Sequence, residues 1–326
     1  MTSPRRTVAA PVFRWFAFAS FLSLILIVLS GTAVRLTGSG MGCPDWPTCF
    51  HHRVTGSWSI HPLIEYGNRM ITVALIFLTG VTFLASLVRR PHRRDLIALS
   101  GMLVGGIIGD AVLGAFVVYS KLNPWLVSLH MLLSLAMVVV GAILYHRSKY
   151  IYGPGGRADV RDPHFRLIAR LLWIPFVALL VAGTITTGSG PHAGSSQGQL
   201  VAKRLPIALS NAAWVHSLAA VLFIGLVTGL LFAIWRMDVP LPLKLGVRRL
   251  VVISLVQAGI GVTQYLTHLP ALLVELHVAG AVSLTIGVTQ FHLRQSAHDR
   301  EPGTKKGVAQ VAGQQRSSEL ASQRRP

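Results

Sequence analysis

Long apolar stretches alternate with short charged or polar segments along the whole chain. Each stretch has about 20 residues, enough for a helix that rises about 1.5 Å per residue to cross a hydrocarbon core of about 30 Å. Lipid offers backbone groups no hydrogen-bond partners, and stretches of this length favour helices over barrel strands. We therefore predict an all-α membrane protein with eight transmembrane helices at 14–34, 63–87, 96–119, 124–145, 167–187, 208–235, 248–267 and 271–293.

Composition and charge indicate how the predicted helices are oriented in the membrane. Of the 326 residues only 13% are charged, about half the roughly 25% usual in a soluble domain. The net charge of +19 would suit nucleic acid if the basic residues formed a folded surface. Instead, 23 of the 30 Lys and Arg residues fall on one side of the predicted membrane. The positive-inside rule makes that side cytoplasmic, so both termini are predicted to be cytoplasmic and no nucleic-acid partner is expected.

The chain contains two similar halves. The first predicted helix ends in GTAVRLTGSG (31–40) and the fifth in GTITTGSG (183–190), while LVSLH (126–130) recurs as LVELH (273–277). These matches keep the same order at offsets of about 147 to 152 residues, which indicates an internal repeat. Because each half has four helices, both halves enter the membrane in the same direction. We predict two pseudo-symmetric parallel four-helix bundles, related by an axis along the membrane normal.

This repeat sets the expected domain boundaries. A cleavable signal peptide is the alternative interpretation of the first apolar stretch, because Arg5 and Arg6 precede it. The final segment is rich in Gln, Ser, Lys and Arg, which is typical of disorder. The predicted parts are a cytoplasmic N-terminus (1–13), an N-terminal bundle (14–145) with an outer loop (35–62), a cytoplasmic linker (146–166), a C-terminal bundle (167–293) and a disordered basic cytoplasmic tail (294–326).

Three of the 13 histidines, His130, His216 and His277, lie within apolar stretches, and the repeat places Asn68 opposite His216. All four positions fall about two turns inside the outer ends of their helices, in one layer about 10 Å below the outer surface. Two neutral imidazoles facing each other across a bundle are what axial ligation of a heme iron requires. We therefore predict His216 and His277 as heme ligands. Buried histidines hydrogen-bonded to a neighbouring helix, or a proton relay, are the alternatives.

The first half is chemically different at the equivalent positions. Asn is a poor iron ligand, so a heme there would be held by His130 alone or with weak sixth coordination from Asn68. Glu65 lies one helical turn before Asn68, where the second half has Ala213. A carboxylate beside a singly ligated heme is typical of a reactive site, so Glu65 is predicted to be catalytic or to orient a substrate. An ion pair with Arg69, worth about 0.3 to 0.5 kcal/mol at a helix surface, is the alternative.

Both cysteines lie in GCPDWPTC (42–49), within the long outer loop. The outer side of a bacterial membrane is oxidising, so a disulfide between Cys43 and Cys49 is predicted. The spacing is not the CxxCH of covalent heme attachment. A metal site that uses both cysteines with His51 and His52 is the alternative. A bridged loop could cap the outer end of the first-half site.

Basic residues near the outer ends of helices are within reach of heme propionates that would point toward water. Ordinary snorkelling at the interface explains the same placement. The candidates are Arg35, Arg69, Lys203 and Arg204.

Over residues 14–293 the chain resembles the heme A synthases of aerobic respiratory organisms. The most specific matches are VRLTGSGMGCPDWPTC (34–49), HPLIEYGNR (61–69), SLHMLLSL (128–135), AWVHSLAA (213–220) and VELHVAGA (274–281). The resemblance implies oxidation of the C8 methyl group of heme O through an alcohol to the formyl group of heme A, and supply of that product to cytochrome oxidase. It also implies a resident heme b on His216 and His277, a substrate half with Glu65 and His130, and the outer-loop disulfide.

Asn68 departs from the family pattern, since better-known members have histidine there. The departure predicts a substrate heme held by one strong ligand, which favours exchange. Expected partners are heme O, membrane lipid and an unidentified electron donor. Further candidates are heme O synthase, cytochrome oxidase assembly factors and a second copy of the chain. The expected location is the plasma membrane of a prokaryote.

Two other functions compete with this interpretation. A b-type membrane cytochrome that only carries electrons would account for His216 and His277 but gives no reason for Glu65. A parallel-repeat transporter would account for the duplication, but the apolar stretches lack broken helices with polar clusters at mid-membrane.

Overall fold

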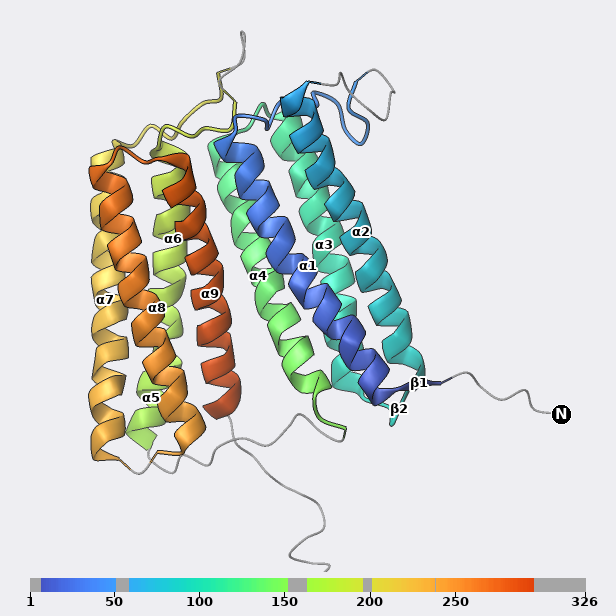
Figure 1. Cartoon of the computed structure of the whole chain (residues 1–326), viewed down its shortest axis with the longest axis vertical. Coiled ribbons are helices and arrows are strands. Elements are labelled where there is room, and N and C mark those ends of the chain that lie inside the picture. The colour runs from blue at the N-terminus through green and yellow to red at the C-terminus, as the bar shows by residue number, and fades with distance from the viewer. Residues whose placement is uncertain (1–6, 51–58, 152–162, 196–200, 238, 296–326) are drawn as a thin grey trace, which may run out of the picture.

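The protein is a set of long helices arranged side by side (Figure 1). The computed structural model describes residues 7–50, 59–151, 163–195, 201–237 and 239–295. Two two-residue strands, β1 (Val8–Ala9) and β2 (Arg89–Arg90), pair in parallel. The helices are α1 (Ala10–Leu36), α2 (Ile60–Val88), α3 (Arg94–Tyr119), α4 (Pro124–Ser148), α5 (Pro163–Leu171), α6 (Trp173–Ser189), α7 (Leu209–Arg236), α8 (Leu241–Leu266) and α9 (Ala271–Gln295).

Eight spans among the described residues are long and apolar enough to cross a membrane, which agrees with the predicted all-α class. Their outward faces carry large apolar side chains, for example Phe77, Trp15 and Leu222, which are 74%, 66% and 60% exposed. Contiguous apolar surface of this kind would be costly in water, whereas lipid accommodates it. The outward faces of the helices therefore suit a bilayer.

The fifth span consists of two helices, whereas the apolar pattern predicted one. Pro175 is the third residue of α6 and has no N–H to donate to the carbonyl of Leu171. The helix is interrupted at Leu172, whose own N–H still donates to the carbonyl of Ile168 at 3.1 Å. The α5–α6 pair thus continues across the interruption, and Phe165–Ser189 forms a single span.

The strand pair is the other feature that the apolar pattern did not predict. Pro91 disfavours a helical conformation at the residue before it, so α2 ends and Arg89 and Arg90 become extended. Arg89 is fully buried and donates to the carbonyls of Pro91 and Ile151. The β1–β2 pairing joins the start of α1 to the turn between α2 and α3, and the contact with Ile151 joins that turn to the segment after α4.

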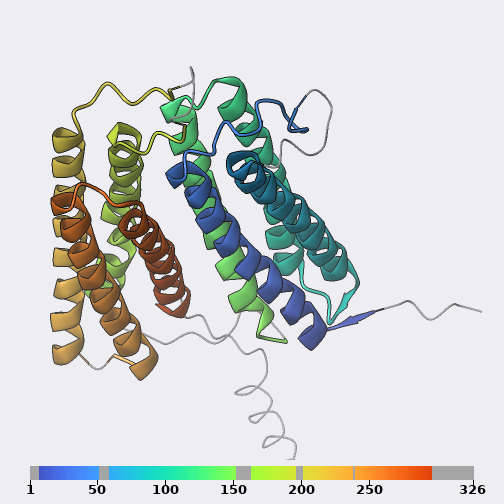
Figure 2. The ribbon, with the colours of Figure 1, turned by 45° about the horizontal axis from the view of Figure 1, so that its top comes forward.

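The helices pack as two groups, α1–α4 and α5–α9, with α4 and α9 in contact where the groups meet (Figures 1 and 2). Each group has its own apolar core, one around Phe13 and Leu96 and the other around Phe223 and Phe291. The start of α1 and the end of α9 lie at the same end of the helices (Figure 1).

The turns that end α3 and α8 share an unusual backbone conformation. Lys121 and Leu122 have φ values of 54° and 61°, and His268 and Leu269 have 61° and 63°. In both turns the second residue donates to the carbonyl five positions earlier, at 2.9 Å for Leu122 and 2.7 Å for Leu269, as in a Schellman motif. Positive φ is uncommon outside glycine. Its recurrence 147 residues later is a backbone counterpart of the sequence repeat.

The two groups are also joined at the end where the long connections lie. Arg35, near the end of α1, donates to the carbonyl of Thr187 at 2.6 Å and to that of His192 at 2.7 Å. Gly40 donates its N–H to the carbonyl of Gly194 at 2.9 Å. The segments that follow α1 and α6 therefore form one connected layer, which Figure 2 brings toward the viewer.

Candidate functional site

The four positions singled out in the sequence lie at matched places on four helices. Asn68, His130, His216 and His277 belong to α2, α4, α7 and α9, each about two turns after the start of its helix. The rings of His216 and His277 face each other with centroids 6.2 Å apart and planes 74° from parallel.

This separation suits a metal between the two rings. A metal–imidazole nitrogen bond is about 2 Å long and the ring centroid lies about 1 Å beyond the nitrogen, so trans ligands have centroids about 6 Å apart. The Nδ1 atom of His277 is buried and has no hydrogen-bond partner in the described part of the chain. A fully satisfied pair of core histidines, the alternative considered from the sequence, would not leave this atom unpaired. The residues present therefore fit an axially ligated iron.

A glycine on the preceding helix lies against each of the four positions. A Cβ atom built on these glycines would be 3.1 to 3.9 Å from the facing side chain. The separations at His216 and His277, 3.1 and 3.3 Å, are tighter than ordinary contacts, so only glycine leaves these rings undisturbed. The pairs are Gly31 and Asn68, Gly114 and His130, Gly183 and His216, and Gly261 and His277.

His130 has an acidic neighbour that the sequence reasoning missed. Its Nδ1 lies 2.7 Å from Oδ1 of Asp110, on α3. The second carboxylate oxygen, Oδ2, accepts a hydrogen bond of 2.5 Å from Ser134, one turn after His130 on α4. The sequence interpretation singled out Glu65 and did not name Asp110. The repeat could have found it, because Asp110 lies 147 residues before Gln257, the offset that relates His130 to His277.

Asn68 also has a hydroxyl partner. Ser30 on α1 donates to Oδ1 of Asn68 at 2.8 Å. The second half has Ala182 at the equivalent place, next to Gly183 as Ser30 is next to Gly31. The first half thus surrounds its two positions with polar groups, whereas the second half keeps an apolar neighbour beside His216.

Glu65 is buried, and both of its carboxylate oxygens have partners. Oε1 lies 2.7 Å from Nη2 of Arg69, and Oε2 accepts the backbone N–H of Cys43 at 2.7 Å. The ion pair considered as an alternative is therefore present. It exists together with a contact to the outer loop, so Glu65 joins α2 to the loop above it.

Arg69 continues this connection. Its two terminal nitrogens also donate to the carbonyls of Cys43, Asp45 and Thr48 at 2.9, 2.6 and 2.8 Å. With Glu65 these contacts use all four terminal N–H groups, so Arg69 holds the loop onto α2. The predicted contacts of Arg69 and Arg35 with propionates stay predictions, as do those of Lys203 and Arg204, which lie on the exposed surface.

The disulfide predicted in the outer loop is confirmed, because Cys43 and Cys49 are bonded and both are fully buried. The bond uses both thiols, so they are not free to bind the metal of the alternative site. His51 and His52 lie outside the described residues. The loop also contacts α3, since the hydroxyl of Tyr119 donates to the carbonyl of Trp46 at 2.8 Å.

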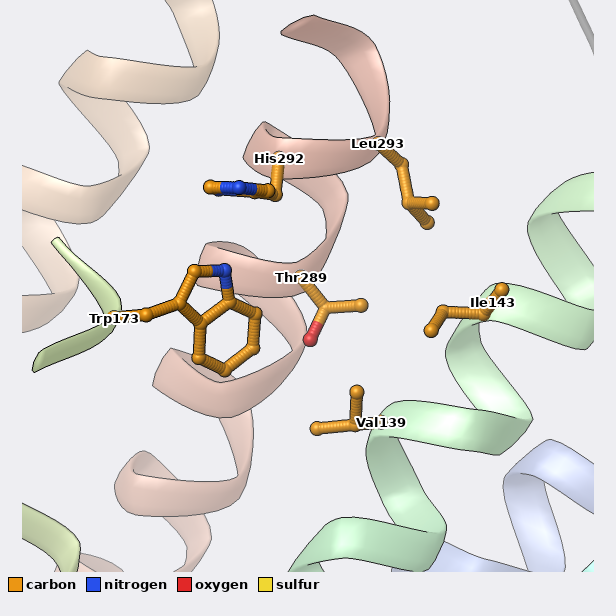
Figure 3. A pocket seen from close by; sticks show the side chains of 6 residues that line it. All are labelled: Val139, Ile143, Trp173, Thr289, His292 and Leu293. Atoms are coloured by element: carbon orange, nitrogen blue, oxygen red, sulfur yellow. The ribbon is translucent and has the colours of Figure 1, made fainter. Parts of the chain in front are cut away.

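A mostly apolar pocket lies elsewhere, between α4, α6 and α9 (Figure 3). His292 in this pocket follows His277 by 15 residues on α9, which is about 22 Å along a helix. The pocket is therefore separate from the layer of the four positions. Its lining residues are Val139, Ile143, Trp173, Thr289, His292 and Leu293.

Two known proteins that resemble this chain are both named heme A synthase. A heme A synthase of Lysinibacillus sphaericus (strain C3-41) is 29% identical over 127 residues, which cover 37% of this chain and 40% of that protein. A heme A synthase of Bacillus cereus (strain 03BB102) is 24% identical over 229 residues, 68% of this chain and 73% of that protein. The COX15-CtaA family, described as "Cytochrome oxidase assembly protein", matches residues 14–288. The chain belongs to this heme A synthase family.

The family match and the helices together establish a multi-pass membrane protein. The matched region includes the outer-loop disulfide, Glu65 and all four positions of the layer. The residues that depart from the repeat, notably Asn68 and Asp110, thus lie inside the part of the chain that carries the family resemblance.

Proposed function

We propose that this protein is a heme A synthase, an oxidoreductase that converts the C8 methyl group of heme O to a formyl group by successive hydroxylations. The proposal rests on the difference between the two halves at their equivalent histidine positions. His216 and His277 face each other at a distance suited to an iron, whereas the first half offers His130 beside the carboxylate of Asp110. A protein with an electron-transfer site alone has no need for the second arrangement.

The second half is proposed to hold a resident heme b through His216 and His277. The two imidazoles would hold the iron, and such a group would supply one-electron transfer when bound. The glycines Gly183 and Gly261 keep the two rings at their separation. The electron donor to this half is a partner still to be identified.

The first half is proposed to bind heme O through His130. Asn68 contributes at most weak coordination, and its Oδ1 already accepts a hydrogen bond from Ser30. Binding through one strong ligand suits a substrate that has to leave as product. Arg35, Lys203 and Arg204 are the proposed partners of heme propionates at the outer ends of the helices. Arg69 is a further proposed partner, through its Nε–H, because its terminal N–H groups already bond Glu65 and the loop.

Glu65 is proposed to orient the substrate or to take up a proton during oxidation. Its carboxylate is buried, 5% exposed, and lies one turn before Asn68 on α2. Arg69 and the N–H of Cys43 fix both oxygens, so the carboxylate keeps a defined position beneath the disulfide loop.

The proposed topology follows the charge distribution. The two bundles, 14–145 and 167–293, are proposed to be pseudo-symmetric parallel repeats with both termini in the cytoplasm of a prokaryote, and the outer loop outside its plasma membrane. Heme O synthase, cytochrome oxidase assembly factors and a second copy of the chain are proposed as further partners.

Expression in a host that makes heme O but not heme A tests the proposal. Hemes are extracted from membranes that contain the protein and a reductant source, and are separated by chromatography. Heme A or its hydroxylated precursor is expected. Folded protein that binds heme b but yields neither product would overturn the proposal in favour of a b-type cytochrome that only carries electrons.

A further inference from the structure

We propose that Asp110, held by Ser134, is the positioning residue of His130. The carboxylate binds Nδ1 of the imidazole and leaves Nε2 for the iron of the substrate heme. The inference deepens the proposed function and rests on it for the identity of the heme.

The chemistry of the two groups determines which nitrogen of His130 carries the proton. Oδ1 of Asp110 lies 2.7 Å from Nδ1 of His130, which is close enough for an ion pair although the two atoms do not meet ordinary hydrogen-bond geometry. Oδ2 accepts from Ser134 at 2.5 Å. An ionised carboxylate only accepts hydrogen bonds, so the imidazole proton is placed on Nδ1. Nε2 has no hydrogen-bond partner in the described part of the chain and is the nitrogen available to a metal.

Two neighbouring turns of α4 fix Asp110. His130 and Ser134 are four residues apart and therefore lie on the same face of the helix. One carboxylate reaches both side chains, one with each oxygen. Asp110 itself precedes Gly114 by one turn on α3, and Gly114 is the glycine that faces the imidazole. The acid and the glycine thus present one face of α3 to His130.

The second half shows what this position does without a carboxylate. Gln257, the repeat equivalent of Asp110, donates its amide to the backbone carbonyl of His277 at 2.9 Å. Its side chain lies against Gly280, where a Cβ atom would come within 2.0 Å of Oε1. The first half has Leu133 at the position of Gly280. Gln257 therefore contacts the backbone, and Nδ1 of His277 has no partner among the described residues.

The hydroxyl is also specific to the first half, because Ala281 occupies the position equivalent to Ser134. A carboxylate on the outer nitrogen of a ligating histidine fixes the ring and raises its basicity. An acid in an apolar span is costly unless it has partners, so its presence there points to a role. A single ligand strengthened in this way compensates for the missing second histidine at Asn68.

The test uses the full-length protein with its resident heme b, loaded with ferrous heme O. Binding is followed by titration, and the iron–histidine stretching band by resonance Raman spectroscopy. Asp110→Asn keeps the size of the side chain and removes its charge. It is expected to weaken heme O binding by about 10-fold to 100-fold and to move the stretching band to lower frequency. Asp110→Glu is expected to restore the band in part.

Two further variants separate positioning from folding. Ser134→Ala removes only the hydroxyl and is expected to give a smaller shift of the same band in the same direction. Gln257→Asn, the matched change in the second half, is expected to leave that band unchanged. If Asp110→Asn kept the affinity and the band, or lost heme b and heme O to the same extent, the inference would be overturned. Neither readout requires turnover, so absence of heme A in the heme O host would overturn only the proposed function.

Discussion

Gly261 on α8 lies directly against the imidazole of His277 on α9, so that a Cβ atom on the glycine would be 3.3 Å from Cε1 of the ring. The same relationship joins Gly114 to His130 in the first half, where the separation is 3.5 Å. The glycine therefore sets how closely the two helices approach at the level of the histidine. Substitution of glycines on α8 tests the importance of this close approach.

Gly261→Ala is expected to displace the ring of His277 and to reduce heme b occupancy, because the added methyl group enters a contact already tighter than usual. The heme-to-protein ratio and the low-spin absorption spectrum measure the effect. Gly259→Ala is the matched control, since a Cβ atom there meets nothing within 4 Å. Alanine is favoured over glycine in a helix by about 1 kcal/mol, so the control should be neutral or stabilising. Equal occupancy in both variants would contradict the predicted role of the glycine.

His216→Ala and His277→Ala are each expected to abolish the low-spin heme b spectrum. A metal held by two trans imidazoles loses its saturated coordination when either is removed. The reduced-minus-oxidised absorption spectrum of purified protein is the measurement. His292→Ala, in the separate pocket on the same helix α9, is the control and should keep the spectrum.

Glu65→Ala is expected to retain the heme b spectrum and to lose turnover of heme O, measured by heme extraction. Because Glu65 also accepts the N–H of Cys43, loss of turnover could follow from movement of the loop. Glu65→Gln keeps an acceptor for that N–H while removing the charge, and it is expected to lose turnover by 10-fold or more, about 1.4 kcal/mol in the barrier. A fully active Glu65→Ala protein would show that the carboxylate has no part in the reaction.

Asn68→His is expected to convert the first-half heme to a six-coordinate, low-spin state. The change is best combined with Ser30→Ala, because the second half has Ala182 beside Gly183 and the hydroxyl of Ser30 is bonded to Asn68. Release of heme O should slow by about tenfold or more, since even about 1.4 kcal/mol from an added ligand has that effect. Stopped-flow transfer of heme O to an apo-heme acceptor measures the rate. An unchanged rate and spin state would mean that this position does not face the iron.

Arg69→Lys is expected to loosen the outer loop while keeping a positive charge near Glu65. A lysine cannot reproduce the contacts to three carbonyls and a carboxylate, and each lost charge-assisted hydrogen bond costs about 1.5 to 3 kcal/mol. Limited proteolysis of the loop in membranes should become faster. Arg204→Lys is the control, since Arg204 is exposed and its hydrogen bond to the carbonyl of Pro191 is long, at 3.3 Å. Similar cleavage of both variants would show that Arg69 does not hold the loop.

Periodicity along single helices predicted much of this architecture. Eight apolar stretches of membrane length gave the eight spans, and the repeat placed Asn68 and the three histidines at matched positions on their helices. Spacing also gave the Glu65–Arg69 pair, because residues four apart share a helix face. The interruption at Leu172 was missed, although Pro175 provided the signal.

The contact of Asp110 with His130 could not be read from local spacing. The two residues belong to different helices, and their meeting depends on how α3 and α4 are rotated about their axes, which an almost uniformly apolar span does not specify. The carbonyl partners of Arg69 could not be predicted from the sequence for a related reason. They depend on the path of a loop whose turns follow no regular period.

The recurrence of two left-handed residues at Lys121–Leu122 and His268–Leu269 means that the duplicated backbone has been kept even where it is energetically unfavourable. Around the four layer positions the halves differ in their side chains: Asn for His, Asp for Gln, Ser for Ala. The chain thus presents two different sets of side chains at matched positions on its helices. Exchanging these few residues between the halves would test how few substitutions are needed to turn the proposed cofactor site into the proposed substrate site.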